Sequence, residues 1–210
     1  MSGRADRVTG SIAAAPFAGF PEHGRIVVFD LEITAWEGSL ARNWSGPGEY
    51  MEVVQIGAVK LDAAMPMAEL DSFEILVQPE KNPVLSEYFT ALTGIGNADL
   101  EREAVGFAEA LSLFATFVGD ARAVLSNGAD WSDLVQNAEW VGMDWPFAAG
   151  LFSNIRPDIA QALGVPNREA VSSGLPARLG LEEVAGAHTG LGDSRAIAAA
   201  LRQLRIDGRL

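Results

Sequence analysis

The stretch Arg25-Ile26-Val27-Val28-Phe29-Asp30-Leu31-Glu32-Ile33-Thr34 decides the fold. Its apolar, β-branched start predicts a strand that is buried on both faces near the middle of a sheet. Residues two apart in a strand point to the same side, so Asp30 and Glu32 should project together where the strand leaves the core. Two adjacent carboxylates repel and lose hydration unless a cation lies between them. Mg²⁺ or Mn²⁺ would suit that position, although two solvated acids at a strand end are a common alternative.

The composition predicts one globular domain and excludes several kinds of metal and redox site. The 210 residues are 49% hydrophobic and 20% charged, which allows a substantial core. The chain has no cysteine, which excludes disulfides and thiolate sites, and its two histidines, His23 and His188, exclude a multi-histidine zinc site. The net charge of −13 argues against a general nucleic-acid coating protein. It leaves room for an enzyme that grips a few nucleotides through metal ions.

The expected organisation is a flexible N-terminal arm, residues 1–24, followed by a single domain, residues 25–210. The arm has no charged start with a long apolar block after it, so no secretory signal is expected. No apolar run approaches the roughly 20 residues of a membrane span. With the absence of cysteine, these features predict a cytoplasmic protein without a membrane partner, and they leave the oligomeric state open.

The order of predicted elements places three strands before most of the helices. The connections between these strands are too short for a helical crossover, so the strands should pair antiparallel; they are expected at residues 25–34, 52–62 and 71–78. Residues 35–50 should form a loop with at most one helical turn. Later residues predict one short strand, 122–125, and helices at 85–92, 106–118, 130–141, 155–163, 179–185 and 194–206.

Two later segments carry polar residues that could complete a site with Asp30 and Glu32. Asp130 opens a predicted helix after a strand and a glycine turn, and Asp133 is the alternative inward residue. Either aspartate, taken alone, is more often a helix cap than a ligand. Near the end of the chain, a flexible loop separates His188 from an aspartate five residues on. A histidine there could take a proton from an attacking water.

These motifs together resemble the DEDDh 3′→5′ exonucleases, and more closely the small RNA-trimming branch than the polymerase proofreading subunits. The resemblance covers residues 25–204 and rests on order and spacing in Phe29 to Thr34, Gln55-Ile56-Gly57-Ala58, Leu92-Thr93-Gly94-Ile95, Gly128-Ala129-Asp130 and His188 to Asp193. It implies an α/β protein with an RNase H-like fold. That fold has a mixed five-stranded sheet, flanked by helices, whose first three strands are antiparallel.

The resemblance also implies a reaction and its residues. Two divalent ions, Mg or Mn, would be held by the four carboxylates of Asp30, Glu32, Asp130 and Asp193. One ion would activate the attacking water, with His188 as the general base, and the other would stabilise the departing 3′ oxygen. The substrate would be the 3′ end of single-stranded nucleic acid, RNA in preference to DNA, released as nucleoside 5′-monophosphates. Its terminal nucleotide would lie against Leu31, Ile33, Thr34, Thr93, Gly94 and Ile95.

Two other interpretations fit parts of the sequence. Asp30-Leu31-Glu32-Ile33-Thr34 imitates the Asp-x-Asp-x-Thr signature of a haloacid-dehalogenase-like, Mg-dependent phosphatase. That mechanism needs a lysine late in the chain, and none follows Lys81; the antiparallel opening also conflicts with its parallel sheet. A non-catalytic nucleic-acid-binding module of the same fold would be expected to lack a carboxylate or the histidine, and all five are present.

Overall fold

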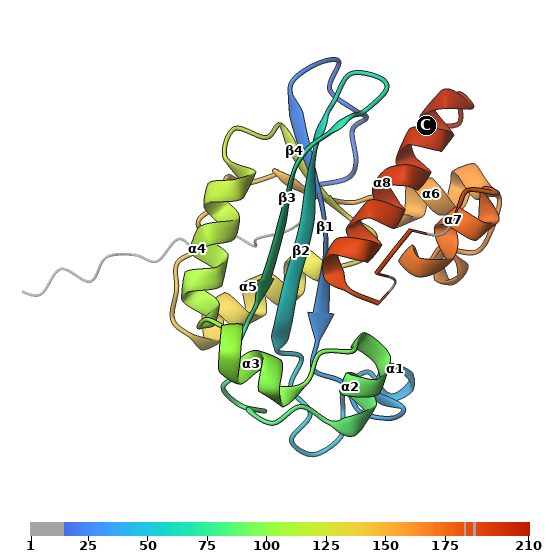
Figure 1. The fold of residues 1–210 in the computed structure, drawn as a ribbon. Coiled ribbons are helices and arrows are strands. Elements are labelled where there is room, and N and C mark those ends of the chain that lie inside the picture. The colour runs from blue at the N-terminus through green and yellow to red at the C-terminus, as the bar shows by residue number, and fades with distance from the viewer. Residues whose placement is uncertain (1–14, 183, 187) are drawn as a thin grey trace, which may run out of the picture.

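A mixed five-stranded sheet forms the centre of the molecule (Figure 1). The computed structural model describes residues 15–182, 184–186 and 188–210. The strand order is β3-β2-β1-β4-β5, with β1 (Arg25–Ile33) in the middle. β1 pairs antiparallel with β2 (Val53–Asp62), which pairs antiparallel with β3 (Glu69–Leu76). β4 (Ala123–Ser126) and β5 (Phe152–Asn154) continue the sheet in parallel, so the predicted mixed sheet is confirmed.

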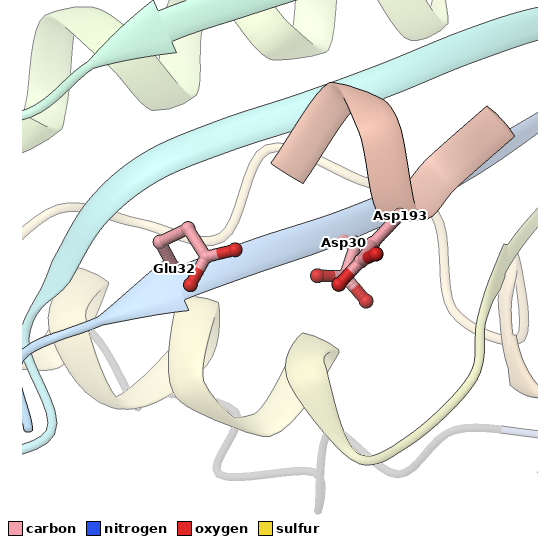
Figure 2. A group of neighbouring side chains, drawn as sticks. All are labelled: Asp30, Glu32 and Asp193. Atoms are coloured by element: carbon pink, nitrogen blue, oxygen red, sulfur yellow. The ribbon is translucent and has the colours of Figure 1, made fainter. Parts of the chain in front are cut away.

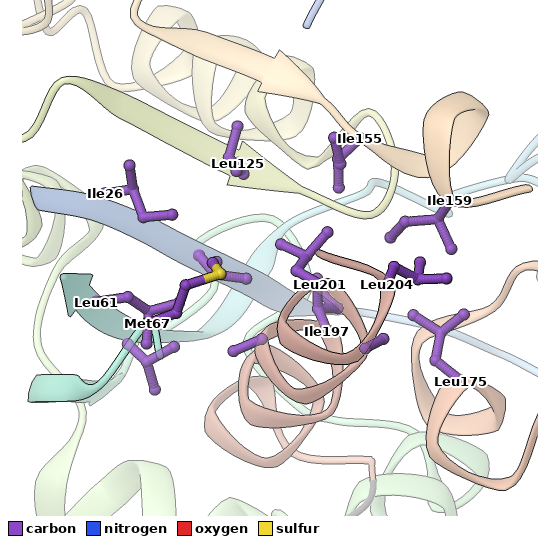
Figure 3. Close-up of a cluster of buried hydrophobic side chains, with 14 of the residues drawn as sticks. Ile26, Leu61, Met67, Leu125, Ile155, Ile159, Leu175, Ile197, Leu201 and Leu204 are labelled. Atoms are coloured by element: carbon purple, nitrogen blue, oxygen red, sulfur yellow. The ribbon is translucent and has the colours of Figure 1, made fainter. Parts of the chain in front are cut away.

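The central strand is buried on both faces, as its apolar run predicts. Ile26 and Val28 point to one side of the sheet, where the long helix α8 (Gly190–Ile206) packs with α6 (Arg156–Leu163) and α7 (Leu175–Arg178) (Figure 3). Val27, Phe29 and Leu31 point to the other side, which α4 (Phe107–Val118) and α5 (Asp130–Trp140) cover. Burial on both faces fixes the strand rigidly, and so fixes the two carboxylates near its end.

Three short helices gather beyond the C-terminal end of β1 (Figure 1). The predicted single turn in the loop after β1 is α1 (Ser39–Arg42), and the predicted helix at residues 85–92 is α2 (Glu87–Thr93). α3 (Asn97–Glu103) was not expected from the sequence. The Ser86 hydroxyl caps α2 and also donates to the Ala35 carbonyl, which ties α2 to the segment leaving the central strand.

The predicted helix at residues 179–185 is wrong: none of its described residues is helical. The helix lies earlier, as α7, after two short 3-10 turns, Asn167–Glu169 and Ser172–Gly174. It ends before Gly180, whose φ of +67° is a left-handed conformation that favours glycine and stops the helix. The final helix is also longer than predicted, because it begins at Gly190 instead of Ser194.

The described part of the predicted N-terminal arm, residues 15–24, lies against the domain. The Ala15 amide donates to the Phe152 carbonyl at 3.0 Å, and Phe17 and Phe20 pack against the core on the α8 face. Residues 1–14 of the arm lie outside the described residues. Within the described part of the chain, no helix is both long enough and apolar enough to cross a membrane.

Candidate active site

Three carboxylates from two elements meet on the α8 face of the sheet (Figure 2). Asp30 and Glu32 lie near the C-terminal end of β1, where they pair with Gly57 and Gln55 of the neighbouring strand β2. Asp193 comes from the first turn of α8 and is only 8% exposed. A carboxylate oxygen from each of the three residues lies within 4.8 Å of the others. The predicted juxtaposition of Asp30 and Glu32 is thus present, with Asp193 brought to them from the far end of the chain.

The first turn of α8 is capped and docked so that Asp193 reaches β1. Its N-cap is Thr189, whose hydroxyl accepts the Gly192 amide at 3.1 Å, so the Asp193 carboxylate is not used as a cap. The Gly190 amide donates to the Gln55 side chain at 2.8 Å, and the Ser194 hydroxyl donates to the Gly57 carbonyl at 2.9 Å. These bonds fasten the helix end onto β2 beside the carboxylates.

Burial and mutual repulsion make the cluster costly to ionise. Burial is the largest cause that raises the pKa of Asp30 well above its usual range, followed by the charges of Asp130, Asp193 and Glu32. Burial and the same two aspartates raise the pKa of Glu32 to about 8. Burial raises the pKa of Asp193, which the positive charge of nearby His188 counteracts. A nearby cation would relieve this repulsion.

Asp130 lies beside the cluster at the start of α5, where Ala129 occupies the N-cap position. The charge of Asp130 raises the pKa of both Asp30 and Glu32, whereas Asp133 is not among the causes of either shift. The pKa of Asp133 is itself raised to about 7, by burial and then by Asp130. These directions favour Asp130 over Asp133 as the fourth carboxylate, and its role as a ligand stays a prediction.

Asp30 is held by a chain of hydrogen bonds from two buried polar residues. The sequence did not single out either residue for the site. The Ser172 hydroxyl donates to a carboxylate oxygen of Asp30 at 3.4 Å. The Asn127 amide in turn donates to the Ser172 hydroxyl at 3.1 Å and to the Ala170 carbonyl at 2.8 Å. Ser172 lies in a segment without clear periodicity, 142 residues from Asp30 along the chain, so no local pattern could have indicated it.

His188 is exposed on the loop before α8, with a φ of +62°. It lies five residues before Asp193, and its charge lowers the pKa of that carboxyl. A left-handed backbone conformation is uncommon for a residue with a side chain and is a recurrent feature of functional sites. The exposed position leaves the imidazole accessible to water and substrate.

Of the six predicted substrate-binding residues, three line one groove and the other three do not. Thr93, Gly94 and Ile95 line a pocket of about 430 Å³ together with Gln55 and Thr189. Leu31 and Ile33 flank Glu32 on β1 and pack on the opposite face of the sheet. The Thr34 side chain is 2% exposed, and its hydroxyl donates to the Tyr50 carbonyl while it accepts the Glu52 amide. This hydroxyl therefore fixes the loop before β2.

The donor set suits a divalent cation that prefers oxygen ligands. Among the described residues, Asp130 Oδ2 and Asp193 Oδ1 are buried without a hydrogen-bond partner. Buried carboxylate oxygens are otherwise paired, because an unpaired one loses its hydration without compensation. The three clustered carboxylates of Asp30, Glu32 and Asp193, and the unpartnered oxygens of Asp130 and Asp193, are the kind of ligand that Mg²⁺ and Mn²⁺ take, so these residues fit such ions.

A sheet of this order, with clustered carboxylates at the end of its central strand, is the RNase H-like class of fold, and comparisons with known proteins agree. A family model described as "Exonuclease" matches residues 27–201. The chain belongs to this exonuclease family, which confirms the resemblance to DEDDh exonucleases seen in the sequence.

Individual relatives give the same result. The chain is 26% identical over 193 residues to 3'-5' exoribonuclease 1 of Rattus norvegicus, covering 87% of this chain and 53% of the relative. It is 33% identical over 93 residues to ERI1 exoribonuclease 2 of Mus musculus, covering 44% of this chain and 12% of the relative. The chain thus spans about half the length of the first relative and less of the second.

Solved structures show the shared fold. The nuclease domain of 3'hExo, described as a DEDDh family member bound to rAMP, superposes with a TM-score of 0.75 at 24% identity, covering 90% of this chain and 96% of that domain. Exonuclease I superposes with a TM-score of 0.67 at 13% identity, covering 87% of this chain and 41% of that one.

Proposed function

We propose that this protein is a metal-dependent 3′→5′ exonuclease that hydrolyses single-stranded nucleic acid, RNA in preference to DNA, to nucleoside 5′-monophosphates. The observation that carries the proposal is the meeting of Asp30, Glu32 and Asp193 within 4.8 Å, with Asp130 facing them. The names of the relatives, 3′-5′ exoribonucleases, and the rAMP bound to one structural neighbour support both the direction and the sugar. A cytoplasmic location stays a prediction from the sequence.

In the proposed reaction the four carboxylates, Asp30, Glu32, Asp130 and Asp193, hold two divalent ions, Mg or Mn. Such ions supply acidity to an attacking water and neutralise charge at the phosphate and at the departing 3′ oxygen. His188, exposed at the rim of the cluster, accepts the proton that the attacking water loses. Ser172 and Asn127 keep the Asp30 carboxylate oriented toward the cluster.

The groove that contains Thr93, Gly94 and Ile95 receives the terminal nucleotide. One wall of the groove is the turn between α2 and α3, and the other includes Thr189, the residue directly after His188. This lining supports a nucleotide position between the turn and the loop that carries the proposed base. The charged residues of the groove are Glu74, Asp99, Glu103 and Arg102, and the Arg102 guanidinium pairs with both Asp99 and Glu103.

The test is hydrolysis of 5′-labelled single-stranded RNA and DNA oligomers with Mg²⁺ or Mn²⁺. We expect a ladder that shortens from the 3′ end, faster on RNA, and that is abolished by EDTA, by Asp193→Asn and by Asp130→Asn. Asp133→Asn is the matched control, since the same substitution three residues from Asp130 should leave most of the activity. Hydrolysis of a small phosphomonoester, without cleavage of either oligomer, would instead support the phosphatase interpretation. Loss of activity in Asp133→Asn with full activity in Asp130→Asn would exchange the roles of these two aspartates.

A further inference from the structure

A second feature of the surface has the chemistry of a nucleotide-binding site. The Lys81 ammonium lies 5.0 Å from the ring centroids of both Tyr50 and Trp140. The two rings meet edge to face with their centroids 5.9 Å apart. Tyr50 is 43% exposed and Lys81 is exposed, so the group presents aromatic surface and a positive charge to solvent. We call Tyr50, Lys81 and Trp140 the aromatic platform.

Buried polar contacts hold the segment that carries Lys81. Glu52 is 4% exposed, and its carboxylate accepts the amides of Glu80 and Lys81 at 2.7 Å each and that of Asn82 at 2.6 Å. The Asn82 side chain accepts the Tyr50 amide at 3.3 Å. The buried Glu52 carboxylate therefore fixes the loop that carries Lys81, and Asn82 links this loop to the backbone of Tyr50.

Trp140, the third residue of the aromatic platform, lies on α5, the helix that also carries the proposed metal ligand Asp130. The Asn137 side-chain oxygen accepts the Val53 backbone N–H at 3.2 Å, and the Asn137 side-chain nitrogen donates to the Met51 carbonyl at 2.9 Å. These two bonds join α5 to the segment after Tyr50. These contacts hold the platform in place before a ligand binds. Binding there would therefore lose little conformational entropy of the protein, a loss that weakens binding at mobile surfaces.

The platform lies at the same end of the sheet as the carboxylate cluster. The Thr34 hydroxyl donates to the Tyr50 carbonyl, and Thr34 is two residues beyond Glu32 on the central strand. Independently, α5 begins at Asp130 and ends at Trp140. Ten residues at 1.5 Å each place the Trp140 backbone roughly 15 Å from that of Asp130. This separation suits a nucleotide upstream of the one being removed.

We propose that the aromatic platform binds an upstream nucleotide of the single-stranded substrate; this inference rests on the proposed function. The Lys81 ammonium contacts a phosphate as a point charge, and an exposed ring face of Tyr50 or Trp140 stacks on the base. The chain has only two lysines, at positions 60 and 81, and this one stands beside aromatic rings at the end of the sheet where the substrate is processed. Stacking tolerates any base, so the site adds affinity for longer substrates without sequence preference.

The chain supplies a matched control for Lys81. Lys60, the other lysine, lies over the Phe117 ring at 4.6 Å and so makes the same type of contact. It stands near the far end of β2, seven residues beyond Val53, roughly 23 Å away along the strand. Lys81→Gln and Lys60→Gln therefore remove the same charge and the same cation–π contact at opposite ends of the sheet.

The experiment measures binding of fluorescein-labelled phosphorothioate RNA, which resists hydrolysis, by anisotropy in Mg²⁺ with the full chain. A dodecamer reaches the platform and a dinucleotide does not. We expect Lys81→Gln and Tyr50→Leu to weaken dodecamer binding about tenfold each and to leave dinucleotide binding unchanged. Lys60→Gln should change neither. Lys81→Gln should also reduce the slope of log Kd against log salt by about 0.7, while Tyr50→Leu should keep the slope.

An equal loss on both probes, or no loss on the dodecamer, would overturn the proposal, and thermal melts check that the variants remain folded. A different result would contradict the proposed exonuclease function. If the unmodified chain binds the dodecamer through the platform but hydrolyses no ordinary RNA, the chain is a binding module and the platform stands. If it hydrolyses RNA and the variants bind like the unmodified chain, the exonuclease stands and the platform is rejected.

Discussion

Replacing Gly57 with alanine tests whether the position of Asp193 depends on close contact between β2 and α8. A Cβ atom added to Gly57 would lie 2.0 Å from the Gly190 carbonyl carbon and from the Leu191 amide nitrogen. Ordinary van der Waals contact begins at 3.4 Å, so the first turn of α8 would have to retreat by about 1.4 Å. Both partners are backbone, which cannot rotate aside as a flexible side chain can. Asp193 is three residues from Gly190 on the same rigid turn and would move with it.

Two effects of different size should follow. Overpacking costs roughly 1–3 kcal/mol of stability, which corresponds to about 2–4 °C in Tm for each kcal/mol in a chain of this length. A displacement of about 1 Å at a reacting centre can cost roughly 100-fold in rate. We therefore expect Gly57→Ala to remain folded and to unfold cooperatively, with a Tm moderately lower than that of the unmodified protein. Its kcat for RNA hydrolysis should be reduced about 100-fold.

The control is Gly106→Ala, where an added Cβ meets nothing within 4 Å and the residue is remote from the carboxylates. This variant should retain its kcat, although it exchanges one N-cap residue for a poorer one and so loses some stability. A Gly57→Ala protein with unchanged kcat and unchanged Mn²⁺ affinity would refute the argument that this contact positions Asp193. Equal losses of rate in both variants would assign the effect to general destabilisation.

Four further outcomes follow from the charges of the site. Asp30→Asn should abolish hydrolysis and raise the metal-free Tm, by about 2–4 °C if the relief of repulsion is worth 1 kcal/mol; a lower Tm in differential scanning calorimetry would contradict it. The pKa of Glu32 is raised from 4.5 to about 8 in the folded state, so the folded state holds the proton more tightly, and metal-free stability should fall as pH rises from about 4.5 to about 8 and level off above it; Glu32→Gln should flatten that dependence in urea titrations. Ser172→Ala should weaken Mn²⁺ binding about 10–100-fold by calorimetry, and unchanged affinity would remove its positioning role. His188→Ala should lower kcat roughly 10²–10⁴-fold at saturating metal, and full activity would exclude it as the base.

The sequence predicted the parts of the fold that strong local signals specify. The central strand, its two carboxylates and the antiparallel β2 and β3 follow from apolar β-branched runs and short connections. α4 and α5 follow from helical periodicity. In each case the residues that form the element also carry the pattern that identifies it, so a single stretch of chain contains enough information.

Elements that depend on distant partners were missed or displaced. β5 has only three residues, Phe152–Asn154, too few to show a period, and its pairing is supplied by β4. The N-cap of α3 is Gly96, which has no side chain to act as a cap, although the Asp99 carboxylate accepts the Gly96 amide at 2.9 Å. The helix expected at residues 179–185 has apolar residues, but Gly180 within it and Gly186 directly after it both have a positive φ, which is unfavourable for a helix.

The same distinction applies to the site. The types of its residues and their order could be read from the sequence, because Asp30, Glu32, Asp193 and His188 lie in short motifs. The buried polar support could not, since Ser172 reaches Asp30 only after the chain has folded. The sequence left Asp130 and Asp133 open as alternatives. The structure favours Asp130, because its charge, and not that of Asp133, raises the pKa of the two carboxylates of β1.

The way in which the cluster is held explains why its support comes from so many places. Mutual repulsion of Asp30, Glu32 and Asp193 would drive the end of α8 away from β1 if only the carboxylates determined the distance. The restraint is instead uncharged: glycine contact between β2 and α8, and hydrogen bonds from Gly190 and Ser194 to β2. Uncharged contacts do not weaken as the carboxylates ionise, so the site keeps its shape when it is most negative. That is also the state in which it binds cations most tightly, because ionised carboxylates are the better ligands.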